Sequence, residues 1–445
     1  ITSMNNLVKS DAALLAHPDR NRLAADDRAV HDWYRFILSF PPHLVREYLS
    51  RFGIRAGQYV LDPFCGTGTT LVECKKLGIS YYGVEANPLA CFASRTKVKW
   101  DIAPQGLLDH ATEVARTAAA TLDADGVPDE TLPLLQSQSH HANGRLRTLP
   151  PAQVALLLTN SISPRPLHKT LVLLEHIAQH GDPRYGDHER LALAKAAVLY
   201  ASNLEFGPEV GVGELKEDAT VVAPWLDTVR QMAADMQGLQ DRTAVPGQVF
   251  QADSRHLNDI LPAQSVHAVI TSPPYPNEKD YTRTTRLESV LLGFVKDKAE
   301  LRLLKQGLLR SNTRGVYRAD DDDRWIAEFP DIQQIADAIE ARRLELGKTS
   351  GFERMYARVT RLYFGGMYRH LANLRRVLYP GAQLAYVVGD QASYLRVLIR
   401  TGELTAQIAA SLGYQVESID LFRTRIATAT REQLREEVVV LRWPG

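Results

Sequence analysis

The feature that most constrains this chain is a glycine-rich turn placed between a short apolar strand and a helix. Residues 58–61 predict the strand, and the turn follows as the segment Asp62–Thr69, which reads DPFCGTGT. A helix is expected over residues 69–77, and a second strand over residues 81–84 ends at Glu85. A strand, a helix and a second strand in this order form one unit of a parallel sheet, so we expect an open α/β fold.

The turn itself has the properties of a ligand site. Gly66 and Gly68 permit a tight turn and a close approach of the backbone to a ligand. The helix that begins there offers unpaired N–H groups and the positive end of its dipole. Glu85, about twenty residues further along, is an acid at a strand end, where it suits the hydroxyls of a ribose. Taken separately, a plain turn and a surface glutamate would explain these residues, but the preceding Asp-Pro-Phe makes the ligand interpretation more specific.

A second segment, Ser272-Pro273-Pro274-Tyr275, follows the apolar run 266–270. Two consecutive prolines cannot continue a central strand, and they stiffen the chain at the strand's carboxyl end, where ligands bind in open α/β sheets. An exocyclic amino group is a poor nucleophile because its lone pair is delocalised into the ring. The Ser272 hydroxyl and the Pro273 carbonyl could accept its two hydrogens, and Tyr275 could stack on a flipped base. The alternative is a stiff loop with a packing tyrosine.

Together, these two segments resemble the motifs of the S-adenosylmethionine-dependent DNA amino-methyltransferases, which modify cytosine N4 or adenine N6. In that family the glycine-rich loop holds the methionine part of the cofactor, and the acid of the second strand holds its ribose. The resemblance assigns cofactor binding to residues of three segments: Asp62, Pro63, Phe64, Gly66, Gly68, Thr69, Glu85, Asp253 and Ser254. It assigns catalysis to Ser272, Pro273, Pro274 and Tyr275. For Asp253, which follows a short strand at 248–251, capping of a helix at 255–260 is an equally good explanation.

The resemblance implies a Rossmann-like, seven-stranded methyltransferase sheet with two insertions, the first mainly helical. The order of the motifs makes the chain a permuted relative of the Asp-Pro-Phe-loop enzymes. Five regions are expected: 1–100, an extra motif and the first half of the core; 101–245, the helical insertion; 246–282, core with the catalytic motif; 283–364, a charged insertion; and 365–445, the second half of the core. Either insertion could contact DNA.

Two local expectations concern the second half of the chain. The acidic run Asp320–Asp323 predicts a solvated loop. One apolar helix face is expected to carry Met367, Leu371, Leu374 and Leu378, before a turn at Pro380-Gly381.

The balance of 52 basic and 52 acidic residues means that any DNA contact must come from local clustering. The densest positive stretch begins directly after the proline motif and runs to Arg318. For any one of its residues, a solvated helix face is the simpler explanation. The residues expected to contact DNA are Asn277, Lys279, Tyr281, Arg283 and Arg286.

Several other classes of protein find no support in the sequence. The three cysteines lack zinc spacing, and none follows a proline in a loop suited to attack on cytosine C5. The 13 histidines show no metal-ligand spacing, so no metal is expected. No apolar run reaches the roughly 18 residues of a membrane span, and no signal peptide is visible. We therefore expect a cytoplasmic protein of a bacterium or archaeon that does not act at a membrane.

The function expected from the sequence is site-specific methylation of double-stranded DNA by S-adenosylmethionine, with companion restriction or defence proteins as plausible partners. Cytosine N4 is the preferred target because Ser-Pro-Pro-Tyr resembles the cytosine-N4 enzymes, whereas adenine-N6 enzymes more often carry Asp or Asn at its first position. The alternatives are an adenine-N6 enzyme, an RNA base methyltransferase, a protein-glutamine methyltransferase, and a cofactor-binding subunit without turnover.

Overall fold

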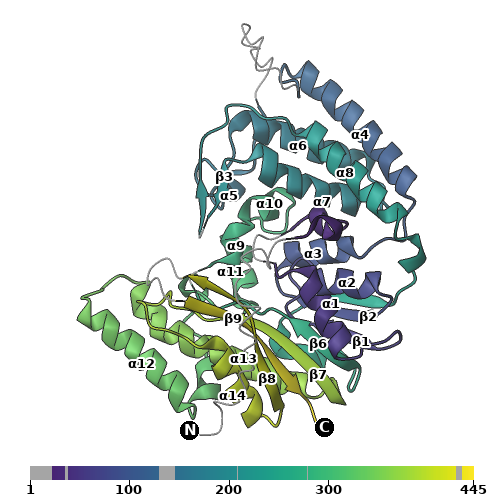
Figure 1. Ribbon diagram of the computed structural model, residues 1–445. Helices are drawn as coiled ribbons and strands as arrows, with labels where there is room; N and C mark the ends of the chain where they lie inside the picture. Colours follow the sequence, from purple (N-terminus) through teal and green to yellow (C-terminus); the bar gives the residue numbers. More distant parts are fainter. Residues whose placement is uncertain (1–22, 36–38, 130–145, 208, 278, 427–432) are drawn as a thin grey trace.

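The computed structural model describes residues 23–35, 39–129, 146–207, 209–277, 279–426 and 433–445 (Figure 1). Its centre is a seven-stranded sheet with the strand order β5-β2-β1-β6-β7-β9-β8. The strands are β1 (Tyr59–Asp62), β2 (Ser80–Glu85), β5 (Gly247–Gln251), β6 (Val266–Thr271), β7 (Leu378–Gly389), β8 (Gln415–Ile426) and β9 (Gln433–Arg442). All neighbours are parallel except β9, which is antiparallel to β7 and to β8. The predicted Rossmann-like sheet is confirmed.

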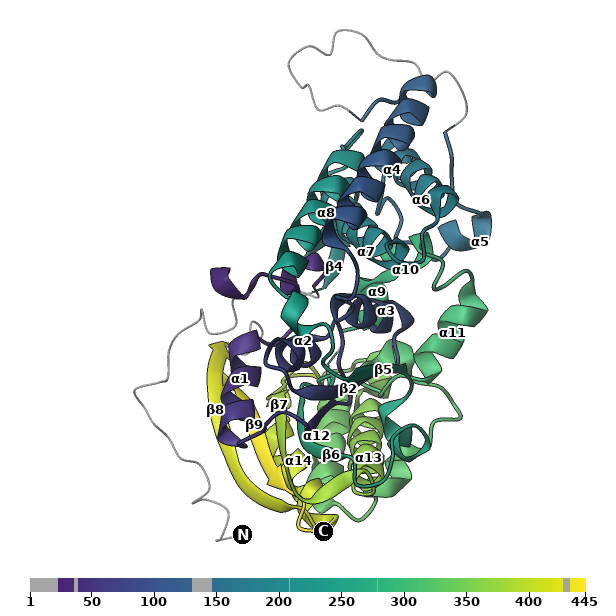
Figure 2. The same ribbon diagram turned by 90° about the vertical axis from the view of Figure 1, so that its right-hand side faces the viewer.

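The sheet is buried on both faces, which explains why its central strands read as continuous apolar runs. Val60 and Leu61 of β1 are both fully buried, but they belong to different core clusters because successive side chains point to opposite faces. Three helices cover the Val60 face: α1 (Pro42–Arg51), α2 (Thr69–Lys76) and α3 (Pro88–Lys97). The Leu61 face is covered by α12 (Pro330–Glu345), α13 (Tyr356–Leu374) and α14 (Thr401–Ser411), as Figure 2 shows.

The first insertion is mainly helical, as predicted. Its elements are α4 (Pro104–Ala124), α5 (Pro151–Val154), α6 (Pro164–His180), α7 (Gly186–Ala196), α8 (Val222–Gln237) and the small strands β3 (Leu204–Phe206) and β4 (Val210–Val212). The bundle lies at one end of the molecule in both views, on the side away from α12 (Figures 1 and 2). Its apolar core, which includes Trp225 of α8, is continuous with the core that covers the Val60 face of the sheet.

The second insertion contains α9 (Tyr281–Thr284), α10 (Arg286–Leu291), α11 (Lys298–Gln306) and α12. The prediction of a solvated loop at Asp320–Asp323 is wrong. Asp322 is only 3% exposed and accepts hydrogen bonds from Arg255 and from Arg369 (2.6 Å to the latter), while Asp320 accepts from Arg310. These carboxylates are buried because arginines of the core and of the insertion pair with them, so this segment joins the insertion to the core.

The helix expected to reach Leu378 ends earlier. Helix α13 stops at Leu374, and Leu378 is instead the first residue of β7. The Pro380-Gly381 turn lies within β7, where the pairing with β6 jumps from Val266↔Leu378 to Ala268↔Gln383. Gly381 has a φ of 87°, a left-handed conformation that glycine adopts without strain. In the described part of the chain, no helix is long and apolar enough to cross a membrane.

Candidate active site

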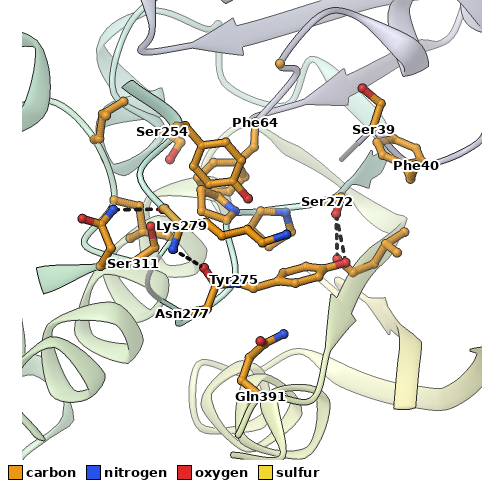
Figure 3. Close-up of a pocket in the computed structure, with 18 of the residues that line it drawn as sticks. Ser39, Phe40, Phe64, Ser254, Ser272, Tyr275, Asn277, Lys279, Ser311 and Gln391 are labelled. Carbon is orange, nitrogen blue, oxygen red and sulfur yellow. Dashed lines mark hydrogen bonds between the residues drawn. The ribbon is translucent and has the colours of Figure 1, made fainter. Parts of the chain in front are cut away.

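A cavity of about 580 Å³ opens at the carboxyl ends of the central strands. Both segments singled out in the sequence line it, although they lie about 200 residues apart: the turn after β1 contributes Phe64, and the segment after β6 contributes Ser272 and Tyr275. Figure 3 shows these side chains with Ser254 around one space. The carboxyl end of a parallel sheet is where α/β proteins bind ligands, so this cavity is the candidate active site.

The glycine turn owes its shape to two different constraints. Gly66 and Gly68 have φ angles of 50° and 85°, both in the left-handed region. A Cβ on Gly66 would meet nothing within 4 Å, whereas a Cβ on Gly68 would lie 3.0 Å from the Ser94 Cβ of α3. Gly66 is therefore favoured by conformation, and Gly68 by conformation and by close packing. Among the other predicted turn residues, Pro63, Phe64 and Thr69 line the cavity.

Glu85 lines the cavity from the end of β2, and two backbone amides hold its carboxylate. Gly66 N donates to Oε2 at 2.9 Å, and Asn87 N donates to Oε1 at 2.8 Å. Burial raises the pKa of Glu85 to about 7. A carboxylate fixed in this way at a cavity wall can accept hydrogen bonds from ligand hydroxyls.

Asp62 lies behind the cavity wall rather than on it. Its carboxylate is fully buried and accepts hydrogen bonds from Thr271 Oγ1 at 2.6 Å and from Phe64 N at 3.1 Å. It thereby joins the turn after β1 to the end of β6. Among the described residues Oδ2 has no hydrogen-bond partner, and burial raises the pKa of Asp62 to about 6.

Asp253 and Ser254, from the third predicted cofactor segment, differ in placement. Ser254 lines the cavity. Asp253 caps the short helix Ser254–Asp259 by accepting from Arg255 N, and its carboxylate is also bound by the Arg255 guanidinium at 2.6 to 3.0 Å. The capping alternative is therefore observed, and the Asp253 carboxylate is engaged within the protein.

Sequence reasoning missed His370 and Tyr386, two buried residues that support this wall of the cavity. His370 of α13 is fully buried, and its ring bonds to the Ser254 carbonyl at 3.0 Å and to the Tyr386 hydroxyl at 2.6 Å. It also packs edge-on against Phe64, with ring centroids 4.9 Å apart. Burial lowers the pKa of His370 to about 4, so the ring is neutral at pH 7. The available signal was a histidine on the apolar face of a helix, which by itself predicts nothing more than packing.

At the end of β6, Ser272 and Tyr275 face one another, with their hydroxyl oxygens 3.5 Å apart (Figure 3). Ser272 Oγ donates to the Val387 carbonyl of β7 at 3.1 Å, so Tyr275 is the donor in the contact between the two hydroxyls, and one Ser272 lone pair remains to accept a further hydrogen bond. Pro273 and Pro274 line the cavity beside them. Burial raises the pKa of Tyr275 well above its usual range, so the phenol stays protonated. The arrangement can accept a proton donor and stack a planar ring.

The five residues expected to contact DNA separate into two groups. Asn277, Lys279 and Tyr281 line the cavity, whereas Arg283 and Arg286 lie outside its lining within the described chain. Arg286 donates to the Thr282 and Leu156 carbonyls at 2.9 and 3.3 Å, so it ties α10 to the first insertion.

Some basic residues further along are paired inside the protein. Lys305 binds Asp280 at 2.7 Å, and Arg310 binds Asp320 at 2.8 Å. Contact of this stretch with DNA stays a prediction. Over the described residues, no group of three or more His, Cys, Asp or Glu side chains is arranged to hold a metal ion.

Comparison with known proteins finds similarity mainly to DNA methyltransferases. Residues 17–94 match the family model described as DNA methylase, of the N6/N4 type. The chain is similar to the Type II methyltransferase M.BsoBI of Geobacillus stearothermophilus, with 24% identity over 94% of this chain and 85% of that protein. It is also similar to the Type II methyltransferase M.AvaI of Nostoc sp., with 24% identity over 93% of this chain and 86% of that protein. A shorter match, 40% identical over 11% of this chain and 14% of the relative, is to a tRNA (guanine(10)-N2)-dimethyltransferase of Methanothermobacter thermautotrophicus.

Proposed function

Because the chain belongs to the S-adenosylmethionine-dependent DNA amino-methyltransferases of the N4/N6 type, we propose that it methylates cytosine at N4 within a specific sequence of double-stranded DNA. The observation that carries the proposal is the Ser272 hydroxyl, which lines the same cavity as the glycine turn and keeps one lone pair to accept a hydrogen bond. Serine at this position resembles the cytosine-N4 enzymes. The Type II relatives also suggest a restriction–modification role, with a companion nuclease as partner.

The residues of the cavity fit the cofactor of this family. Gly66 brings backbone to the ligand space, Gly68 lies outside the cavity lining of the described residues and shapes the turn, and the Glu85 carboxylate suits ribose hydroxyls. We assign contact with the adenine ring of the cofactor to Phe64 and Ser254, which line the cavity. Asp253, the other predicted cofactor residue of this segment, already has its carboxylate bound by Arg255. When bound, S-adenosylmethionine supplies an electrophilic methyl group on a positively charged sulfur.

The chain's own residues then act on the target base. The base leaves the duplex and stacks on Tyr275, while the Ser272 Oγ and the Pro273 carbonyl accept hydrogen bonds from its amino group. These acceptors draw the nitrogen lone pair out of the ring and stabilise the positive charge that develops on nitrogen. Transfer of the methyl group would exchange its bond to sulfur for the new N–C bond, and one amino proton would leave to solvent. No covalent link between base and protein is required.

The test is analysis of nucleosides by mass spectrometry after incubation of the protein with labelled S-adenosylmethionine and unmethylated genomic DNA. We expect labelled N4-methylcytosine. Ser272→Ala should lower kcat by about 100- to 1000-fold, the usual cost of removing one polar contact to developing charge, with cofactor affinity unchanged. Ser265→Ala is the matched control, because Ser265 precedes the same strand at its other end and its hydroxyl donates only to the Pro262 carbonyl among the described residues.

Other products would correct the proposal in different ways. Labelled N6-methyladenine would keep the mechanism and overturn the choice of base. Label in RNA oligonucleotides and none in DNA would support the RNA alternative, to which the tRNA methyltransferase match points over only 47 residues. Tight cofactor binding with no labelled product would indicate a subunit without turnover.

A further inference from the structure

The cavity extends past Tyr275 to the three neighbouring strands β7, β9 and β8. Their register pairs Gly389 of β7 with Glu436 of β9, and Glu436 with Arg423 of β8. Directly opposed residues of adjacent strands point to the same face of a sheet. Glu436 and Arg423 accordingly line the same cavity as Ser272 and Tyr275.

Gly389 brings this pair up to the candidate catalytic tyrosine. A Cβ on Gly389 would lie 3.1 Å from Tyr275 Cε2 and 3.3 Å from Glu436 Cγ, so the ring edge and the glutamate stem both pack on this glycine. Glu436 Oε2 in turn accepts from Arg423 Nε at 2.6 Å. A series of contacts therefore runs from Ser272 through Tyr275, Gly389 and Glu436 to Arg423.

Two arginines lie near Glu436, and they differ in their hydrogen-bond partners. Arg425 Nη2 donates to the Asp390 carbonyl at 2.9 Å, and its Nε lies 3.5 Å from Glu436 Oε1. Arg423 is held through Nε, and within the described chain its two Nη groups have no hydrogen-bond partner, although the side chain is only 21% exposed. Neither Nη group is among the described chain's buried side-chain atoms without a partner, so both face the solvent of the cavity, where a ligand with paired acceptors can replace water.

The base proposed above offers matching acceptors. A cytosine whose N4 amino group is held at Ser272 still presents N3 and O2, two adjacent acceptors on one ring edge. The planar guanidinium presents donors in a fork that suits paired acceptors. An adenine held by its N6 amino group presents N1, but a C–H group stands next to it. We propose that Arg423, positioned by Glu436, recognises N3 and O2 of the extruded cytosine and so excludes adenine; this inference rests on the proposed function.

The experiment is a double-mutant cycle in which Arg423 and the target base are changed separately and together. Once the modified positions in treated DNA are mapped, duplexes carrying the target cytosine, or 3-deazacytosine at the same position, are compared as substrates. The analogue keeps the amino group and O2 but has C–H in place of N3. We expect the wild-type protein to prefer cytosine by about 10- to 100-fold in kcat/KM, and Arg423→Met to reduce this preference close to unity. Glu436→Gln should reduce it partly, because Arg423 loses the charge that orients it.

The matched control is Arg442→Met. Arg442 lies on the same strand pair and binds Glu417 in the same manner, but it is outside the cavity lining among the described residues, so the preference for cytosine should persist. Cofactor affinity and melting temperature, measured for every variant, show whether the fold is intact. A folded Arg423→Met variant that still forms N4-methylcytosine with undiminished preference over the analogue would overturn the inference and leave the proposed function standing. Formation of N6-methyladenine by the wild-type protein would overturn both.

Discussion

Replacement of Gly68 by alanine tests the shape of the cofactor turn. Gly68 has φ 85° and ψ 30° at the start of α2, and a non-glycine residue pays about 1–2 kcal/mol there because its Cβ crowds the following carbonyl. The new Cβ would also lie 3.0 Å from Ser94 Cβ and 3.3 Å from Ser94 Cα, an overpacking that costs about 1–3 kcal/mol more. We expect Gly68→Ala to lower the free energy of unfolding by about 2–5 kcal/mol.

Two further variants separate the two costs. Gly66→Ala carries the left-handed cost alone, because nothing lies within 4 Å of its Cβ position, so it should lose only about 1–2 kcal/mol. Ser94→Gly removes the atom that the Gly68→Ala methyl group would strike, at about 1 kcal/mol for a glycine within α3. The double variant of Gly68→Ala with Ser94→Gly should therefore be more stable than the sum of the single changes allows.

The free energies come from urea unfolding, and S-adenosylmethionine affinity is measured by calorimetry on the same samples. Strict additivity of the two changes would refute the packing argument, because the interaction energy would then be zero. Equal losses for Gly66→Ala and Gly68→Ala would refute it as well. A loss of affinity in Gly68→Ala that Ser94→Gly restores would link the packing of the turn on α3 to cofactor binding.

Two more predictions concern buried carboxylates. Burial raises the pKa of Glu85 to about 7, so the free energy of unfolding should fall as the pH rises through about 7. Cofactor affinity should change in the opposite direction, because the hydroxyl groups of the ligand donate to the ionised carboxylate. The affinity should therefore weaken by up to about tenfold for each pH unit below 7. Calorimetry in buffers of different ionisation enthalpy would detect the proton released on binding, and Glu85→Gln should remove this pH dependence of cofactor affinity. Asp322→Ala should cost about 1.5–3 kcal/mol, because Arg255 and Arg369 lose the buried carboxylate that they share, while Arg255 keeps its pairing with Asp253. Asp321→Ala should change stability by no more than about 1 kcal/mol, since Asp321 is 54% exposed and pairs with the exposed Arg324. Equal urea midpoints for these two variants would mean that the buried network contributes nothing.

The parts of the fold that the sequence predicts well are those set by neighbouring residues. The strand expected over 58–61 is β1 (Tyr59–Asp62), and the helix expected over 69–77 is α2 (Thr69–Lys76). Apolar runs, glycines and prolines act over a few residues, so their effect is visible in a single sequence. The seven-stranded sheet then follows from the order of such units.

The errors arose where distant partners change the meaning of a local pattern. Four consecutive aspartates usually indicate a solvated loop, but Asp322 binds Arg255 and Arg369, which lie 67 and 47 residues away. The helical spacing of Leu374 and Leu378 continued the pattern across the true end of α13, because Leu378 is buried again as the first residue of β7. A periodic apolar pattern indicates which residues are buried, and Leu374 of α13 and Leu378 of β7 are both buried.

The two halves of the candidate site differ for the same reason. On the cofactor side, the glycines and their neighbours are contiguous, so their spacing alone indicates a ligand. On the side of the target base, Gly389, Glu436 and Arg423 meet only through the register of β7, β9 and β8. A slip of one residue in either pairing would turn a side chain to the opposite face, and no property of the separate segments reveals which register is adopted. An arginine in an alternating strand therefore resembles any surface cation until its neighbours across the sheet are known, although these neighbours decide whether it reaches the base.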